Sequence, residues 1–155
     1  MQPTQPEHVT RLRRANIKVT RIRIALLDLL AAQERHMTAD EITVALRKAG
    51  VRADRVTVYR NIDRMIQDGL LVPTLLPGRA LHVGLCTRPD AAHHHHVVCE
   101  RCGRVAETDG CPVREVWERL SREIQEQRGF QLTDHITQYV GICPECQRKG
   151  IKPRQ

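Results

Sequence analysis

The stretch that decides the fold runs from Val56 to Cys86 and reads VTVYRNIDRMIQDGLLVPTLLPGRALHVGLC. Apolar side chains recur in its first third at three- and four-residue spacing, which predicts a helix that Gly69 ends. Two extended segments follow, Leu70–Leu76 and Ala80–Cys86, and Pro77-Gly78 predicts the turn between them. The sequence therefore predicts a helix followed directly by a β-hairpin.

Further short helices are predicted upstream of this stretch. Residues 8–16 have the pattern of a short basic helix, and Thr20 is a candidate N-cap for a second helix. Thr38 and Glu41 have the spacing of a capping box for a third helix, which Gly50 ends. Helices followed by a hairpin form a winged helix-turn-helix domain, whose last helix enters the DNA major groove.

Charge is unevenly distributed along the 155 residues, whose net charge is +7. Residues 1–84 hold 14 lysines and arginines against 8 acidic residues, and residues 85–155 hold 11 against 10. A basic half favours nucleic acid as partner, although a basic surface can also be simply solvated. The candidate DNA contacts are Arg11, Lys18, Thr57, Tyr59, Arg60 and Arg64.

Histidine and cysteine cluster in the second half of the chain. His93 to His96 run into Cys99-Glu100-Arg101-Cys102, and Cys143-Pro144-Glu145-Cys146 follows later. Two C-x-x-C pairs supply the four thiolates of a closed tetrahedral zinc site, so these four cysteines are predicted to hold a structural zinc.

The four consecutive histidines exceed what that closed site can use, which predicts another kind of metal site. Alternate side chains of a strand face opposite ways, so His94 and His96 would serve one site and His93 and His95 another. An adventitious metal-binding tract is the simpler alternative.

Residues 93–155 are predicted to form a small α/β module. Strands are expected over His95–Glu100, Arg104–Thr108 and His135–Cys143, and a helix from Pro112 to Gly129. The apolar stripe of that helix, expected to face inward, is Val113, Val116, Trp117, Leu120 and Ile124. Few apolar residues are left for an independent core, which predicts a homodimer.

The polar segment 87–92 is predicted to be a hinge, so the expected domains are 1–86 and 93–155 on either side of it. The 41% of hydrophobic residues includes no run of about 20 that would span a membrane, and the polar start shows no signal peptide. A cytoplasmic chain is expected, in which cysteines bind metal, with disulfides as the alternative. No H-E-x-x-H, phosphate loop or nucleophile elbow indicates an enzyme or a small organic substrate.

Several motifs together resemble the ferric uptake regulator family over roughly residues 8–148. They are Val19-Thr20, Thr57–Arg60, Asp68–Leu71, the histidine run before Cys99-x-x-Cys102-Gly103, and Cys143-x-x-Cys146. The resemblance implies an α+β fold with an N-terminal winged helix-turn-helix domain, followed by a small α/β dimerisation domain with structural zinc. It also implies a homodimeric, metal-activated transcription repressor, for which a palindromic operator is expected.

The family pattern implies three metal roles. The four paired cysteines match its structural zinc. His94 and His96 match a regulatory site at the hinge, which His36 would reach from the DNA-binding domain. A second site within the dimer domain matches His93, His95, Glu118 and His135, and Glu118 is preferred to Glu115 because it precedes His135 by seventeen residues.

The hairpin departs from the iron-type pattern. His82 stands where iron regulators place a carboxylate, and Cys86 stands where zinc-type members use a cysteine, so the fourth hinge ligand is open between His36 and His82. Cys86 with histidines is a soft, nitrogen-rich set, which predicts zinc as corepressor.

An iron-, manganese- or nickel-responsive or peroxide-sensing regulator is the alternative within the family. A zinc metalloenzyme or a metal storage protein is the remote one. Two residues are expected to have no role at the metal sites: Cys111 is expected to be free, and His8 exposed.

Overall fold

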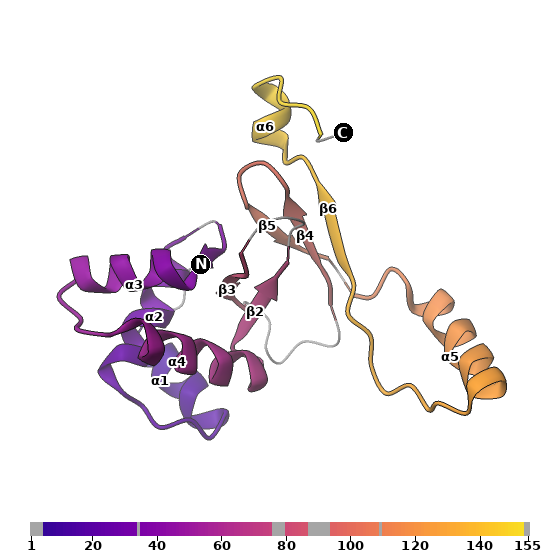
Figure 1. Cartoon of the computed structure of the whole chain (residues 1–155), viewed down its shortest axis with the longest axis horizontal. Helices are drawn as coiled ribbons and strands as arrows, with labels where there is room; N and C mark the ends of the chain where they lie inside the picture. Colours follow the sequence, from indigo (N-terminus) through magenta and orange to yellow (C-terminus); the bar gives the residue numbers. More distant parts are fainter. Residues whose placement is uncertain (1–4, 34, 76–79, 87–93, 109, 154–155) are drawn as a thin grey trace. The chain divides into compact units, whose positions relative to one another are not determined.

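The computed structural model describes residues 5–33, 35–75, 80–86, 94–108 and 110–153 (Figure 1). The chain divides into two compact units. The N-terminal unit comprises residues 1–89 with 102–104, and the C-terminal unit comprises residues 90–101 and 105–155. The predicted hinge, 87–92, lies outside the described residues. Within the described ranges, no helix is long and apolar enough to cross a membrane.

The described residues of the N-terminal unit form four helices and a three-stranded sheet. The helices are α1 (Gln5–Arg14), α2 (Arg21–Ala31), α3 (Ala39–Lys48) and α4 (Arg55–Gln67), and the strands are β1 (Met37–Thr38), β2 (Leu71–Thr74) and β3 (His82–Leu85). β3 lies between β1 and β2 and is antiparallel to both. The expected helices and the two paired strands of the hairpin are present, and the predicted turn at Pro77-Gly78 lies outside the described residues. β1 was not predicted, because two residues are too few to show an alternating pattern.

An aliphatic core holds the N-terminal unit together. Each fully buried side chain of this kind contributes about 1.5–3 kcal/mol relative to an exposed one. The buried members of the cluster are Leu12, Ile17, Leu26, Leu27, Leu30, Met37, Ala39, Ile42, Leu46, Val51, Val58, Ile62, Met65, Leu70, Leu71 and Val83. The core joins all four helices to the hairpin, so it fixes α4 relative to the rest of this unit.

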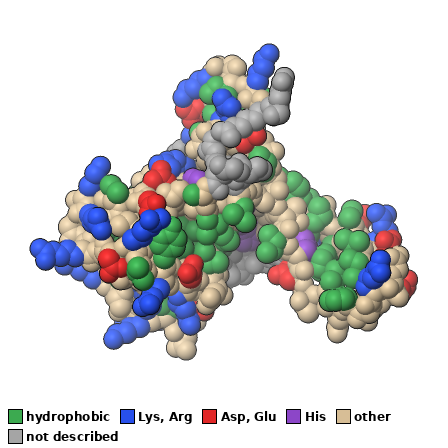
Figure 2. All heavy atoms as spheres, in the orientation of Figure 1, with side chains coloured by type: hydrophobic (Ala, Val, Ile, Leu, Met, Phe, Trp, Pro, Cys, Tyr) green, Lys and Arg blue, Asp and Glu red, His purple; other side chains and the backbone are tan. Residues whose placement is uncertain are grey.

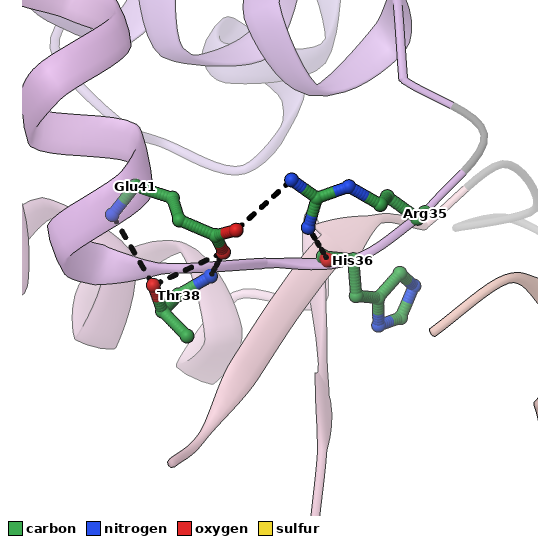
Figure 3. Close-up of polar contacts among 4 residues, drawn as sticks. All are labelled: Arg35, His36, Thr38 and Glu41. Carbon is green, nitrogen blue, oxygen red and sulfur yellow. Dashed lines mark hydrogen bonds and ion pairs between the residues drawn. The ribbon is translucent and has the colours of Figure 1, made fainter. Parts of the chain in front are cut away.

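Local signals set the helix ends as predicted, with one exception. The capping box of α3 is present: Glu41 N–H donates to Thr38 Oγ1 at 3.2 Å, and Thr38 N–H donates to Glu41 Oε2 at 2.8 Å (Figure 3). Gly50 follows α3 with φ +73°, the left-handed conformation that favours glycine. The exception is Thr20, which occupies the N-cap position of α2 without a side-chain hydrogen bond to the helix.

In the C-terminal unit the described residues form a second three-stranded sheet and two helices. Its elements are β4 (His96–Cys99), β5 (Val105–Glu107), α5 (Arg114–Arg128), β6 (Gln138–Gly141) and α6 (Pro144–Arg148). β4 is central, antiparallel to β5 and parallel to β6. The short α6 was not predicted; Pro144 stands at its first turn, where the missing N–H is no loss.

Burial in the C-terminal unit differs from the prediction. α5 has its expected stripe, but none of its residues is buried, and Val116 and Leu120 are 53% and 43% exposed. Ile136 and Val140 lie in the segment predicted as the last strand, His135–Cys143, and are 99% and 48% exposed, so this segment does not bury an apolar face among the described residues. The periodicity correctly marked apolar faces, but the described residues of the chain leave much of them exposed.

The fold class is confirmed. The helices and hairpin of the first unit have the winged-helix order, and the second unit is a small α/β module with clustered cysteines.

Candidate metal centres

The four paired cysteines converge in the structure. Their sulfur atoms all lie within 4.8 Å of one another. Cys99 Sγ and Cys146 Sγ are 3.9 Å apart, whereas a disulfide bond is about 2.05 Å long. Tetrahedral thiolates with Zn–S distances of about 2.3 Å would place the sulfurs about 3.8 Å apart, so the cluster fits a structural zinc.

The local backbone structure positions these four sulfur atoms. Cys99 ends β4, and Gly103 lets the chain turn back after Cys102 with φ +76°. Cys143 and Cys146 lie at the start of α6, and Cys143 N–H donates to Cys99 Sγ at 3.4 Å. An N–H directed at a sulfur stabilises its thiolate form.

A second group consists of His94, His96 and Glu107. Glu107 Oε1 lies 3.9 Å from His94 Nε2 and 3.8 Å from His96 Nε2. The Nε2 atoms of both histidines are buried and have no hydrogen-bond partner among the described residues. Burial lowers the pKa of His96, and neighbouring His94 lowers it further against the opposing effect of Glu107. The neutral ring is the form that binds a metal.

A third group consists of His95, Cys111 and His135. His95 Nε2 lies 3.2 Å from Cys111 Sγ and 3.2 Å from His135 Nε2, and Cys111 Sγ lies 3.5 Å from His135 Nε2. Glu118, predicted for this site, is exposed on α5 and is not in the group. Cys111, predicted to be free, is in it. The predicted ligand His93 lies outside the described residues.

The remaining predicted hinge ligands lie in the N-terminal unit, and none joins these groups of described residues. His36 is buried, with Nδ1 2.6 Å from Thr74 Oγ1. Its ring packs on Gly84 so closely that a Cβ there would lie 2.0 Å from His36 Cδ2. Cys86 is buried at the end of the hairpin, and His82 Nδ1 is 2.6 Å from the carbonyl oxygen of Ala80.

The predicted DNA contacts differ in their surroundings. Tyr59 and Arg60 are exposed on α4, and the guanidinium of Arg55 stacks 5.5 Å from the centroid of the Tyr59 ring. Thr57 is held at the start of α4 by Asp54, and Arg64 pairs with Asp68. Lys18 is exposed. Figure 2 shows many Lys and Arg side chains on the surface of this unit.

Arg11 is less available than predicted. It is half-buried and donates to the carbonyl oxygen of Cys86 at 2.9 Å, so its guanidinium links α1 to the end of the hairpin.

His8 was expected to be exposed, and that prediction is wrong. Its side chain is fully buried in α1, with Nε2 3.5 Å from Asp28 Oδ1 of α2. Burial lowers the pKa of His8, and Asp28 offsets this only in part. His8 is in none of the metal-ligating groups that the described part of the chain forms.

Sequence reasoning missed Glu107 and Cys111. Glu107 ends β5 directly opposite His96 on β4, so a strand pairing deduced from the sequence would have indicated it. Cys111 lies in the connection between β5 and α5, and no periodic pattern predicts where such a connection goes.

Comparisons with known proteins identify the chain's relatives. The model of the ferric uptake regulator family matches residues 14–140. A ferric uptake regulation protein of Neisseria meningitidis serogroup A is 30% identical over 145 residues, which cover 92% of this chain and 95% of the relative. A peroxide-responsive repressor, PerR, of Staphylococcus aureus is 32% identical over 145 residues, with coverages of 92% and 91%.

Two solved structures are also similar. The ferric uptake regulator of Vibrio cholerae has a TM-score of 0.54 at 30% identity, covering 86% of this chain and 98% of its own. A zinc uptake regulator in complex with zinc and DNA has a TM-score of 0.73 at 24% identity, covering 94% of both chains, which is a likeness of fold.

Proposed function

This chain belongs to the ferric uptake regulator family of metal-responsive transcriptional regulators, and we propose that it is a zinc-responsive repressor of its zinc uptake regulator branch. As a homodimer in the cytoplasm, it binds a palindromic operator when its regulatory metal site is filled. It has no enzymatic activity. Residues 1–86 bind DNA, residues 87–92 are the hinge, and residues 93–155 form the dimer.

The observation that carries this proposal is the pair of buried, unpartnered ring nitrogens of His94 and His96 beside Glu107. Leaving such polar atoms unsatisfied costs about 1–3 kcal/mol each, which a bound cation would recover. The three side chains come from β4, its preceding residues and β5. In our proposal Cys86 completes this set from the hairpin, with His82 or His36 as a further donor.

Zinc is proposed as the regulatory metal because thiolate and imidazole are ligands that zinc accepts readily in tetrahedral geometry. Glu107 adds a harder oxygen ligand, which iron(II) and manganese also accept, so the metal has to be settled by titration. The separate four-cysteine cluster holds the structural zinc, which supplies folding energy and not regulation.

Coupling to DNA follows from where the proposed ligands lie in the sequence. A metal held by residues of both units binds fully only when the units have one relative orientation. Binding then favours that orientation by the difference in affinity between the two states. In that orientation the α4 helices of two protomers would read successive major grooves, with Thr57, Tyr59, Arg60 and Arg64 as contacts, Lys18 on phosphate, and Arg11 near the backbone.

The uncovered stripe of α5 supports the homodimer. Figure 2 shows apolar side chains gathered over α5, and the described residues of one protomer leave them exposed. A symmetric dimer brings the same patch of each subunit together and would bury both stripes at once.

The test is operator binding measured by fluorescence anisotropy at buffered free zinc, iron(II), manganese and nickel. We expect tight binding at the lowest free concentration of zinc. His96→Ala and Cys86→Ala should each abolish the metal dependence while keeping the dimer and the zinc of the four-cysteine cluster. Val97→Ala is the matched control, because it changes the next residue of β4, and it should behave as wild type.

Two outcomes contradict the proposal. A response to iron(II) without a response to zinc overturns the zinc assignment. Normal metal-dependent binding by both His96→Ala and Cys86→Ala overturns the regulatory site itself.

A further inference from the structure

The group of His95, Cys111 and His135 brings three segments of the C-terminal unit to one point. His95 directly precedes β4, Cys111 lies between β5 and α5, and His135 lies between α5 and β6. The three ligand atoms form a triangle with sides of 3.2, 3.2 and 3.5 Å. This triangle is much tighter than the group around Glu107, whose Nε2–Oε1 distances are 3.9 and 3.8 Å.

The triangle has the dimensions of a zinc coordination sphere. With Zn–N distances of about 2.0–2.1 Å and a Zn–S distance of about 2.3 Å, tetrahedral ligands place two nitrogens about 3.3 Å apart and a nitrogen and a sulfur about 3.5 Å apart. The observed N–N separation is 3.2 Å, and the N–S separations are 3.2 and 3.5 Å.

Hydrogen bonding alone accounts for this triangle poorly. A neutral imidazole Nε2 is either a donor or an acceptor, and a thiol has one proton. If one Nε2–H donates to Cys111 Sγ and the thiol donates to the other Nε2, the two N–S contacts are hydrogen bonds, but no proton is left for the contact between the two nitrogens. Hydrogen bonds therefore account for at most two of the three contacts at once, whereas a single metal ion accounts for all three.

The surroundings hold the ligands in this arrangement. Thr108 Oγ1 accepts the backbone N–H of His95 at 3.0 Å and donates to the carbonyl oxygen of Gly110 at 2.9 Å. This hydroxyl therefore ties the residue before Cys111 to the residue before β4. The Trp117 ring of α5 stacks on His135 with centroids 4.5 Å apart, and the His95 side is closed off, with 2% of the residue exposed.

We propose that the Cys111 thiolate, and not Glu118, is a direct ligand beside His95 and His135 in the dimer-domain site that the family resemblance implies, which makes it a soft metal site distinct from both the four-cysteine cluster and the His94 group. Two imidazoles and one thiolate favour zinc or cobalt(II) over manganese(II), which prefers oxygen ligands. A carboxylate at this place, as expected for Glu118, would have made the site harder and less selective. The site stands on the geometry of the C-terminal unit and does not depend on DNA binding.

Cobalt(II) tests the proposal, because a thiolate bound to cobalt gives a charge-transfer absorption that imidazole and carboxylate do not. The experiment uses full-length Cys86→Ala protein with one zinc retained in the four-cysteine cluster, verified by metal analysis, so that Cys111 is the thiolate left to report. Added cobalt(II) should produce the band. Cys86→Ala/Cys111→Ser should lack it, and Cys86→Ala/Glu118→Ala should retain it.

Zinc competition on the same proteins gives the size of the effect. Loss of an outer-shell partner costs about 10–100-fold in metal affinity, so loss of a direct ligand in Cys111→Ser should cost more than that. Glu118→Ala should bind zinc within about twofold of its parent, well inside that range.

A second measurement guards against a variant that fails to fold. In the parent protein under reducing conditions, added zinc should slow alkylation of Cys111 by iodoacetamide, followed by mass spectrometry of the Cys111 peptide. An unchanged rate overturns the proposal, as does a cobalt band that survives Cys111→Ser or is lost in Glu118→Ala. Failure of zinc to regulate operator binding would leave each of these readouts intact and would count against the proposed function alone.

Discussion

The two units of this chain are stabilised by different means. The N-terminal unit has an aliphatic core that runs from Leu12 to Val83. In the C-terminal unit, Val98 is buried together with His95, Cys99 and Cys146, and α5 buries nothing. Where the first unit has leucine and isoleucine, the second has groups of histidine, cysteine and glutamate. We therefore expect the first unit to be stabilised by its own packing and the second to depend on what it binds.

This difference suits a regulator. In the proposed function α4 reads DNA and must keep its shape in every state, and the core that fixes it contains no ligand. A sensing unit must change its free energy when a metal arrives, and a unit that lacks an apolar core makes the metal a large part of its stability.

The largest expected effect is that of removing the structural zinc. Cys99→Ser, or chelation under reducing conditions, should unfold the C-terminal unit, because structural zinc contributes about 10 kcal/mol or more in small domains. The N-terminal unit should keep its helices. Amide hydrogen exchange followed by mass spectrometry separates the two units, and loss of protection in both together would contradict the comparison. Cys86→Ala, which should keep the dimer and the structural zinc, is the control for cysteine loss outside the cluster.

Next in size is a cavity in the N-terminal core. Ile42→Ala removes a side chain that is fully buried in α3 and should cost about 2–5 kcal/mol of unfolding free energy. Val44→Ala, on the exposed side of the same helix, should cost under about 0.5 kcal/mol. Urea denaturation of the N-terminal unit measures both. The two values should be the same with and without chelator, and a dependence on chelator would show that the core also relies on metal.

A smaller effect is expected at Gly84, with Gly141 as its counterpart in the other sheet. An added Cβ at Gly84 would lie 2.0 Å from His36 Cδ2, whereas one at Gly141 would meet nothing within 4 Å. Gly84→Ala should therefore cost about 1–3 kcal/mol through overpacking, and Gly141→Ala should be near neutral. Thermal unfolding of the two variants gives the comparison. Equal melting temperatures would mean that the His36 ring moves away without cost.

The smallest effect concerns helix caps. Thr38→Ala removes the capping box of α3 and should cost about 1 kcal/mol, whereas Thr20→Ala removes a side chain that makes no cap hydrogen bond and should cost less. Thermal unfolding near neutral pH compares the two variants. A larger loss at Thr20 would contradict the role of the box.

The same box predicts a pH dependence. Burial disfavours ionised Glu41, but hydrogen bonds from Arg35 and Thr38 outweigh it and lower the pKa of Glu41 (Figure 3). A lowered pKa means that this stabilisation is present above the unfolded-state pKa and is lost as pH falls through the folded-state pKa. The stability difference between wild type and Thr38→Ala should therefore shrink in acid, which unfolding curves at several pH values measure.

Local features of the fold could be predicted from the sequence because they depend on neighbours in the chain. The Thr38–Glu41 box, Gly50 and the hairpin each need only a few residues to form. The predictions that failed concerned contacts between residues far apart in the sequence. His8 is buried because α2 covers it, and no pattern within α1 reveals that.

The candidate sites divide in the same way. The C-x-x-C spacing alone predicted the four-cysteine site, because the two cysteines of each pair are close together in the sequence and need only one turn of chain to converge. Residue spacing did not predict Glu107 or Cys111 as ligands. Glu107 comes close to His96 through strand pairing, and Cys111 comes close to its histidines through the folded connection between β5 and α5. The apolar stripe of α5 was predicted correctly, but it was expected to be buried within its own unit. None of its residues in α5 is buried there.

That stripe makes the amount of protein a variable of the proposed regulation. Two chains must meet before the stripe is covered, so at low concentration the number of dimers rises with the square of the number of free chains. Halving the supply of chains would then remove about three-quarters of the dimers, by mass action alone. Operator DNA and zinc, if they bind the dimer in preference, would each draw more chains into it. Occupancy of the operator would then depend on both the free zinc concentration and the concentration of this protein.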